Sequence, residues 1–280
     1  MTAPLLEVAD LRVSFSSERG GLEAVRGISF AMGREKLGIV GESGSGKTLT
    51  GRSILRLLPP GAELRAERLA FDGVDLLAAS SARLRELRGR RLAMVMQDPK
   101  FSLNPVMTVG DQIAEAYLAH SRASRAEARE KALAMLEAVR IRDPRRVYAF
   151  YPHEVSGGMG QRIMIAMMLA PGPDLLVADE PTSALDVTVQ MQVLAILDDL
   201  VSERGMGLVF ISHDLTLVAS FCDRVLVMYG GRVVETLEAR ELGRARHPYT
   251  RGLMACLPQL SGAEGDLPVL SRDPAWLEAP

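Results

Sequence analysis

A glycine-rich segment constrains the fold of this chain more than any other feature. It reads Gly41-Glu42-Ser43-Gly44-Ser45-Gly46-Lys47-Thr48 and directly follows an apolar run at residues 37–40. The spacing G-x-x-x-x-G-K-[ST], between a buried strand and a helix, is typical of a loop that holds phosphates. Glycines let backbone N–H groups turn inward around phosphate oxygens, and the start of the helix adds positive potential. We therefore predict an α/β fold with a helix that begins at Lys47 and stops at Pro59-Pro60, because proline cannot continue it.

In such a loop the lysine and the following hydroxyl have distinct tasks. Lys47 reaches the β- and γ-phosphates, and the Thr48 hydroxyl sits on Mg²⁺. The alternative is an ordinary glycine-rich turn between a strand and a helix. Average residue usage produces the pattern by chance in roughly one chain in a hundred of this length. Phosphate binding is therefore the stronger interpretation.

Short apolar and alternating runs predict the strands. Residues 175–178 and 208–211 resemble 37–40 and predict strands buried on both faces. Residues 5–13 and 24–30 alternate and predict half-buried antiparallel strands. Residues 225–228 and 232–234 predict a last pair turned by Gly230-Gly231. Between residues 100 and 160 the character is helical, with a capping box formed by Ser124 and Glu127. The order predicts an α/β core with a β-rich start and an inserted helical subdomain.

Composition narrows the class of protein. The 280 residues carry 33 basic and 35 acidic side chains, so a strongly basic nucleic-acid surface is excluded. Two cysteines cannot form a disulfide framework, which indicates a reducing compartment. The first residues lack the pattern of a secretory signal, and no stretch approaches the roughly 18 apolar residues of a membrane helix. We expect a soluble cytosolic protein.

Polar side chains follow the later buried runs. Asp179 and Glu180 follow residues 175–178, and His213 follows residues 208–211. Ligands of an open parallel sheet bind at the carboxyl ends of its strands, so these groups are expected to face the phosphate loop. Asp179 would hold Mg²⁺ through water, and Glu180 would accept a proton from the attacking water. The alternatives are that the two carboxylates are ordinary solvated turn residues and that the histidine is structural. Both alternatives are weaker interpretations, because three buried strands are followed by Lys47, by Asp179 and Glu180, and by His213.

A second glycine-containing segment precedes the apolar stretch that ends at Pro171. It reads Ser156-Gly157-Gly158-Met159-Gly160-Gln161-Arg162. The serine is placed to cap a helix, and the glycines leave the first amide groups uncovered. An ordinary helix start remains the alternative. The best functional use is to close on the γ-phosphate of a nucleotide held by another subunit.

Together these motifs resemble the ATP-binding cassette (ABC) ATPases. Residues 41–48 resemble the family's Walker A, Gln97 its Q-loop glutamine, residues 156–161 its signature, 175–180 its Walker B, 183–186 its D-loop and His213 its switch histidine. The resemblance spans residues 5 to about 235. It implies a P-loop NTPase (RecA-like) core with an N-terminal antiparallel β-subdomain and an inserted α-helical subdomain.

The resemblance also implies a head-to-tail dimer with two ATP molecules sandwiched at the interface. Each site would take Walker A and Walker B from one subunit and the signature from the other. The implied catalytic residues are Glu180, His213, Gln97 and Lys47, and the implied Mg²⁺ ligands are Thr48, Gln97 and Asp179. The implied ATP-binding residues are 41–48, Thr50 and Phe15, whose alternative is a core strand residue. Ser156, Gly157, Gly158, Gln161 and Asp186 would serve the partner's site.

Three segments resemble a narrower group, the ATPase subunits of dipeptide, oligopeptide and nickel importers. These are residues 96–105, 179–188 and His247-Pro248-Tyr249-Thr250. The resemblance implies a paralogous second ATPase, two transmembrane permeases, a periplasmic or extracellular solute-binding protein and no nucleic acid. The permeases' coupling helices would dock beside Gln97 and the helical insert. The expected location is the cytoplasmic face of the membrane, and the expected division is an ATPase domain at 1–237, with its helical subdomain at about 100–164, and a C-terminal extension at 238–280.

The sequence departs from relatives in a few places. Met159 replaces the general signature's glutamine, as is usual in this subgroup, and Gly160 stands where a basic residue is more common. Many relatives carry a C-terminal cysteine cluster of the iron–sulfur kind. Here the tail has only Cys256, so we expect no cluster. One histidine is no metal site, and His247 is assigned a structural role.

Other functions stay open. The cargo could be a peptide, or alternatively nickel or another small solute. A soluble ABC ATPase that remodels ribosomes or DNA is a different class, but such proteins usually carry two cassettes or a long coiled coil. A third alternative is a module that binds a nucleotide but does not hydrolyse it. The presence of both Glu180 and His213 argues against this alternative, because an inactive site would be expected to have lost one of them.

Overall fold

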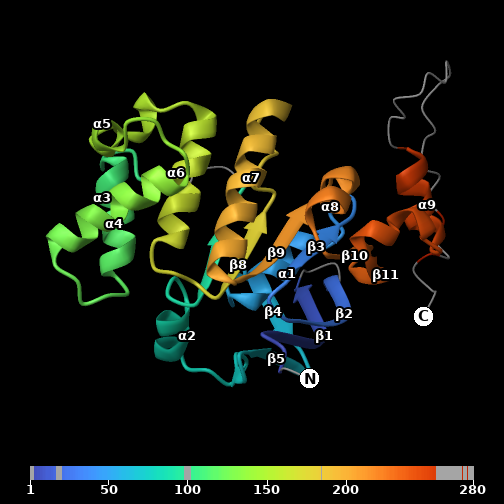
Figure 1. Cartoon of the computed structure of the whole chain (residues 1–280). Helices are drawn as coiled ribbons and strands as arrows, with labels where there is room; N and C mark the ends of the chain where they lie inside the picture. Colours follow the sequence, from blue (N-terminus) through green and yellow to red (C-terminus); the bar gives the residue numbers. More distant parts are fainter. Residues whose placement is uncertain are drawn as a thin grey trace, which may run out of the picture. The chain divides into compact units, whose positions relative to one another are not determined.

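The computed structural model describes residues 3–16, 21–97, 102–183, 185–256, 273 and 276. The chain divides into two compact units, one of residues 1–78 with 210–280 and one of residues 79–209. Figure 1 follows the elements of both units along the chain, from blue at the N-terminus to red at the C-terminus. Strand β9 (Gly207–Ser212) crosses the division between the units.

The first unit contains an antiparallel sheet. Its strands are β1 (Leu6–Phe15), β2 (Leu22–Met32), β4 (Ala62–Arg65), β5 (Arg68–Phe71) and β6 (Val74–Asp75). The order is β2-β1-β5-β6, and β4 also pairs with β1. Every other residue of β1 from Leu6 is buried until the register shifts at a bulge, as an alternating apolar run predicts.

The second sheet of this unit carries the glycine-rich loop. Strand β3 (Lys36–Val40) lies parallel to β10 (Arg224–Tyr229), which pairs antiparallel with β11 (Arg232–Glu238). Gly230 and Gly231 turn this hairpin with φ of 53° and 85°, as predicted, because such a turn needs positive φ at both residues. Helices α1 (Lys47–Ile54), α8 (Leu215–Phe221) and α9 (Pro248–Ala255) and the 3₁₀ turn η3 (Ala239–Arg244) complete the unit.

Helix α1 begins at Lys47 as predicted, but its predicted end was wrong. It ends at Ile54, well before Pro59. Arg56 adopts a left-handed φ of 54°, and the N–H groups of Arg56 and Leu57 donate to the carbonyls of Ser53 and Arg52. This left-handed conformation at the C-terminal end of a helix is usually adopted by glycine. Because arginine stands there instead, the sequence does not indicate that the helix ends at this point.

The second unit is mainly helical. It contains α2 (Ser81–Leu87), α3 (Val109–Leu118), α4 (Arg125–Ala138), α5 (Pro144–Tyr148), the 3₁₀ turn η2 (Pro152–Glu154), α6 (Gly157–Leu169) and α7 (Val187–Arg204). Strands β7 (Leu92–Val95) and β8 (Leu175–Asp179) pair in parallel and are fully buried. The helical character predicted between residues 100 and 160 is confirmed, as is the capping box of Ser124 and Glu127. Within the described residues, no helix combines the length and apolar character needed to cross a membrane.

The close contact between Gly110 and Tyr148 in this unit leads to a prediction about stability. A Cβ added to Gly110 of α3 would overlap the ring of Tyr148, whose hydroxyl donates to Asp111 Oδ1 at 2.9 Å. An alanine normally stabilises a helix by about 0.5–1 kcal/mol over glycine. Here overpacking should outweigh that gain, so Gly110→Ala should cost about 1–2 kcal/mol and lower the thermal midpoint by about 3–6 °C. Gly243→Ala, at a position with open space, is the control; an unchanged midpoint in Gly110→Ala would contradict the packing argument.

Candidate functional site

The glycine-rich loop connects β3 to α1 in the first unit. Gly41 has a φ of 157°, and a Cβ there would overlap the carbonyl oxygen of Met228 in β10. Gly44 and Gly46 have φ of 81° and 97°, a region that side chains rarely adopt. The glycines of the sequence pattern are therefore required by the shape of the loop and by its contact with the sheet.

Lys47 lies inside this loop. Its side chain is only 5% exposed, and Nζ donates to the carbonyl oxygens of Gly41 and Glu42 at 2.7 Å each. Lys47 also begins α1, which follows Gly46 without a side-chain cap and has no acidic residue in its first turn. The positive end of the helix dipole thus meets a buried ammonium, an arrangement suited to an anion such as a phosphate.

The hydroxyls of the loop differ in their surroundings. Ser43 and Gly44 form the exposed tip of the loop, whereas Ser45 is buried. The described residues give the Ser45 Oγ no hydrogen-bond partner. Thr50 is fully buried and its hydroxyl donates to the Gly46 carbonyl at 3.0 Å, so it supports the loop from within the helix. Thr48, in the first turn of α1, is half-buried.

His213 follows β9, the strand next to β3 in the sheet. Its side chain is exposed, while Asp214 caps α8 by accepting the Leu217 N–H at 3.0 Å. The phosphate loop and His213 therefore follow neighbouring strands. Phe15 ends β1 half-buried, opposite Leu22 and Ala62, so it is not a core residue.

In the second unit, two predicted residues meet at the ends of β7 and β8. The amide Nε2 of Gln97 donates to Glu180 Oε2 at 3.3 Å. Asp179, the last residue of β8, is 5% exposed, whereas Glu180 is half-buried. Glu180 also has a left-handed φ of 47°, a strained conformation of the kind that clusters at functional sites. The structure thus presents one buried carboxylate and one accessible, oriented carboxylate side by side.

The second glycine-containing segment starts α6. Ser156 caps the helix by accepting the Met159 N–H at 3.3 Å, and Gly157 is exposed. A Cβ on Gly158 would come within 2.6 Å of Val189 in α7, so packing alone requires a glycine there. Gln161 is 2% exposed, and its Nε2 has no partner among the described residues.

Asp186 caps α7 by accepting the Val189 N–H at 3.0 Å. Part of the predicted D-loop and Q-loop, namely Ala184 and residues 98–101, lies outside the described residues.

The described residues contain no group of three or more His, Cys, Asp and Glu that could hold a metal ion.

Sequence reasoning missed two features. The Tyr249 hydroxyl accepts the Glu42 N–H of the phosphate loop at 3.0 Å, although the residues are 207 positions apart. No local pattern marks such a contact. His247 has the structural role predicted for it, since its Nδ1 accepts the Tyr249 N–H at the start of α9.

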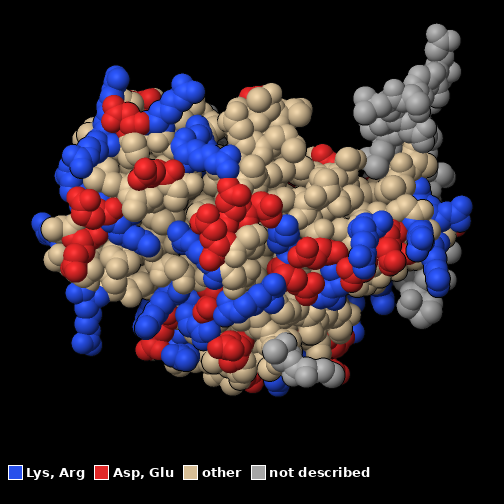
Figure 2. Space-filling model, in the orientation of Figure 1, with Lys and Arg blue, Asp and Glu red and all other residues tan. Residues whose placement is uncertain are grey.

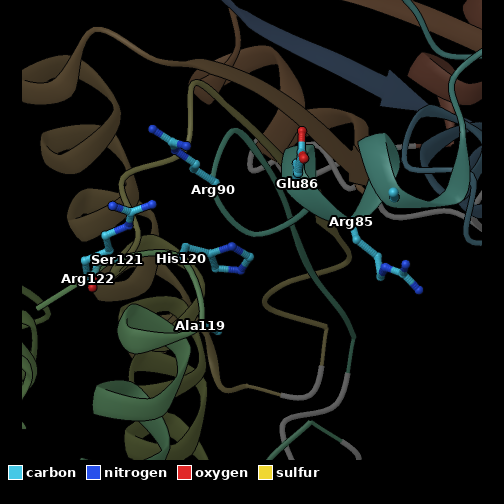
Figure 3. Close-up of a pocket in the computed structure, with 8 residues that line it drawn as sticks. Arg85, Glu86, Arg90, Ala119, His120, Ser121 and Arg122 are labelled. Carbon is cyan, nitrogen blue, oxygen red and sulfur yellow. The ribbon is translucent and has the colours of Figure 1, made fainter.

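The second missed feature is an open basic pocket of about 730 Å³ in the second unit. It is lined by Ala82, Arg85, Glu86, Arg90, Ala119, His120, Ser121 and Arg122. Figure 3 shows the His120 ring extending from the end of α3 toward the segment that carries Arg90. Burial, and then the charge of Arg90, lower the pKa of His120. Acidic and basic side chains are interspersed on the face in Figure 2, in keeping with the formal charge of −2.

Comparisons with known proteins identify similar sequences. Residues 25–183 match a family described as ABC transporter. A probable peptide ABC transporter ATP-binding protein, y4tR of Sinorhizobium fredii, is 53% identical over 268 residues, which cover 94% of this chain and 80% of the relative. The oligopeptide transport ATP-binding protein OppD of Bacillus subtilis is 46% identical over 281 residues, which cover 99% of this chain and 78% of the relative.

A solved structure has the same fold. A dimeric ATP-binding cassette, MJ0796 bound to ADP and Pi, superposes with a TM-score of 0.75 at 24% identity. The alignment covers 84% of this chain and 99% of that one. The predicted fold class, a P-loop core with an antiparallel β-subdomain and inserted helices, is confirmed.

Proposed function

Because this chain belongs to the ATP-binding proteins of ABC transporters, we propose that it hydrolyses ATP to energise the import of peptides. The observation that carries the peptide assignment is the identity of 53% and 46% with peptide and oligopeptide transport proteins over nearly the whole chain. The phosphate loop around Lys47 supports the ATPase activity. Nickel or another small solute is the alternative cargo, and no observation favours a ribosome or DNA remodelling function.

The residues divide the proposed reaction among them. Loop N–H groups and Lys47 bind the phosphates, which neutralises part of the charge that develops during phosphoryl transfer. Glu180 accepts a proton from the attacking water, and the bond from Gln97 orients its carboxylate. His213 orients the water or the γ-phosphate. Phe15 stacks on the adenine, consistent with its partly exposed ring.

Mg²⁺ is part of the proposal. Thr48, Asp179 and Gln97 would hold it, and all three offer the oxygen ligands that Mg²⁺ prefers. The bound ion would neutralise phosphate charge. Oxygen atoms of the nucleotide's phosphates would supply the remaining ligands.

Partners complete the proposed machine. The exposed start of α6 at Ser156 to Gly158, with Asp186, would face the nucleotide of a second ATPase subunit. Two transmembrane permeases and an external solute-binding protein would complete an importer with this chain on the cytoplasmic side. The coupling helices of the permeases would dock beside Gln97 and the helical insert.

A concentration series tests the shared site. If the signature must come from a second subunit, ATP hydrolysis per molecule should be weak in dilute solution and rise with protein concentration, because dimers form by mass action. The measurement is phosphate release over about a hundredfold range of concentration, with size-exclusion chromatography as the check on dimer formation. Fast turnover that does not depend on concentration would contradict the proposal.

The cargo needs a separate test. The genes beside this one should encode a solute-binding protein and two permeases, and the assembled complex can be placed in liposomes. ATP-dependent uptake of a labelled oligopeptide, unaffected by excess nickel, is the expected result. Nickel uptake without peptide uptake would favour the alternative.

A further inference from the structure

Tyr249 is fully buried in an aromatic cluster of the first unit. Its ring lies 4.4 Å from that of Tyr229, at the end of β10, and 5.9 Å from that of Trp276. Tyr229 and Trp276 also meet edge to face at 5.7 Å. Two neighbouring aromatic rings therefore fix the position of the Tyr249 ring, and this fixes the direction in which its hydroxyl points.

Local sequence fixes the backbone of this tyrosine as well. His247 accepts the Tyr249 N–H at 3.2 Å, and Pro248 occupies the first position of α9, where its missing N–H costs nothing. The carboxylate of Glu235 in β11 accepts the N–H groups of Arg246 and His247 at 2.7 and 3.3 Å. The start of α9, drawn in red in Figure 1, is thus anchored to β11 just before Tyr249.

The hydroxyl acts on a peptide of the phosphate loop. It accepts the Glu42 N–H at 3.0 Å, and the carbonyl oxygen of the same Gly41–Glu42 peptide accepts Lys47 Nζ at 2.7 Å. Both polar atoms of this peptide are therefore held by side chains. The Met228 carbonyl also packs directly against Gly41, which prevents the peptide from retreating toward the sheet.

We propose that Tyr249 is a positioning residue that holds the phosphate loop in shape for the nucleotide. This inference rests on the proposed ATPase function. When Lys47 donates to the phosphates instead of to the loop carbonyls, the Gly41 carbonyl oxygen no longer accepts a hydrogen bond from Lys47 Nζ. The bond from Glu42 to Tyr249 does not involve Lys47 and keeps the peptide in place. The C-terminal extension thereby contributes directly to ATP affinity.

Tyr249→Phe tests this idea because it removes only the hydroxyl and keeps the ring in its cluster. The dissociation constant for a fluorescent ATP analogue with Mg²⁺ should rise by about 3- to 10-fold. In the protein without nucleotide, the Glu42 amide should exchange its hydrogen faster by a similar factor. The thermal midpoint should stay close to that of the unaltered chain. Tyr229→Phe, which removes a hydroxyl from the neighbouring ring, is the matched control and should change neither quantity.

The outcomes separate the inference from the proposed function. If the unaltered chain fails to bind the ATP analogue, the proposed function is wrong, whereas the amide exchange still reports on the contact. If the chain binds ATP but Tyr249→Phe binds equally well, the positioning role is refuted. A lowered thermal midpoint with unchanged affinity would also refute it, because the tyrosine would then serve only packing.

Discussion

Replacing Glu180 with glutamine is expected to slow ATP hydrolysis at least about 100-fold while ATP binding persists. A positioned general base contributes typically 10²- to 10⁴-fold, and an amide cannot accept the proton. The substitution keeps the size of the side chain, and its amide oxygen can still accept the bond from Gln97. Binding and hydrolysis should therefore separate, and the variant should accumulate as a closed dimer with ATP.

The measurement combines phosphate release with size-exclusion chromatography in the presence of ATP and Mg²⁺. Glu130→Gln, an exposed carboxylate on α4 in the same unit, removes the same charge and should hydrolyse ATP like the unaltered chain. Full turnover by Glu180→Gln would refute the assignment of the base. Loss of ATP binding would show instead that the carboxylate shapes the site.

The parts of the fold that could be predicted are those that neighbouring residues determine. The phosphate loop needs glycines at fixed spacing, the hairpin needs positive φ at Gly230 and Gly231, and the box of Ser124 and Glu127 closes within one turn. In each case the residues that make the structure lie within a few positions of one another. The apolar run at residues 92–95 would also have revealed β7 by the same reasoning.

The parts that sequence could not reveal depend on distant partners. Strands β4 to β6 are short, and their register is set by pairing with β1 or with one another rather than by an apolar pattern of their own. The contact of Tyr249 with Glu42 joins segments 207 residues apart. The end of α1 could not be predicted either, because its left-handed residue is Arg56 and not glycine. The motifs of the candidate site are local and can be recognised in the sequence, whereas the contacts that support them, such as that of Tyr249 with Glu42, join distant segments.

Lys47→Ala is expected to abolish ATP hydrolysis, with a loss of at least about 100-fold, and to weaken ATP binding strongly. The substitution removes a buried ammonium beside the phosphate site, a preorganised charge of the kind that contributes about 10² to 10³ in rate. It also removes the bonds to the Gly41 and Glu42 carbonyls, so a thermal melt must show that the chain still folds. Lys47→Arg keeps the charge but not the compact ammonium, and should fold but remain inactive.

A mixture of two inactive variants tests whether each ATP site is formed by residues of two subunits. Ser156→Arg places a bulky cation at the exposed start of α6, where a second subunit's nucleotide would lie, and should also be inactive. A mixed dimer of Lys47→Ala and Ser156→Arg has one site with an intact lysine and an intact serine, and one site with neither. Half of the dimers in an equal mixture are mixed, so about a quarter of the unaltered activity should return. Sites built within single subunits would instead give no recovery at any ratio, because each chain would keep its own defect.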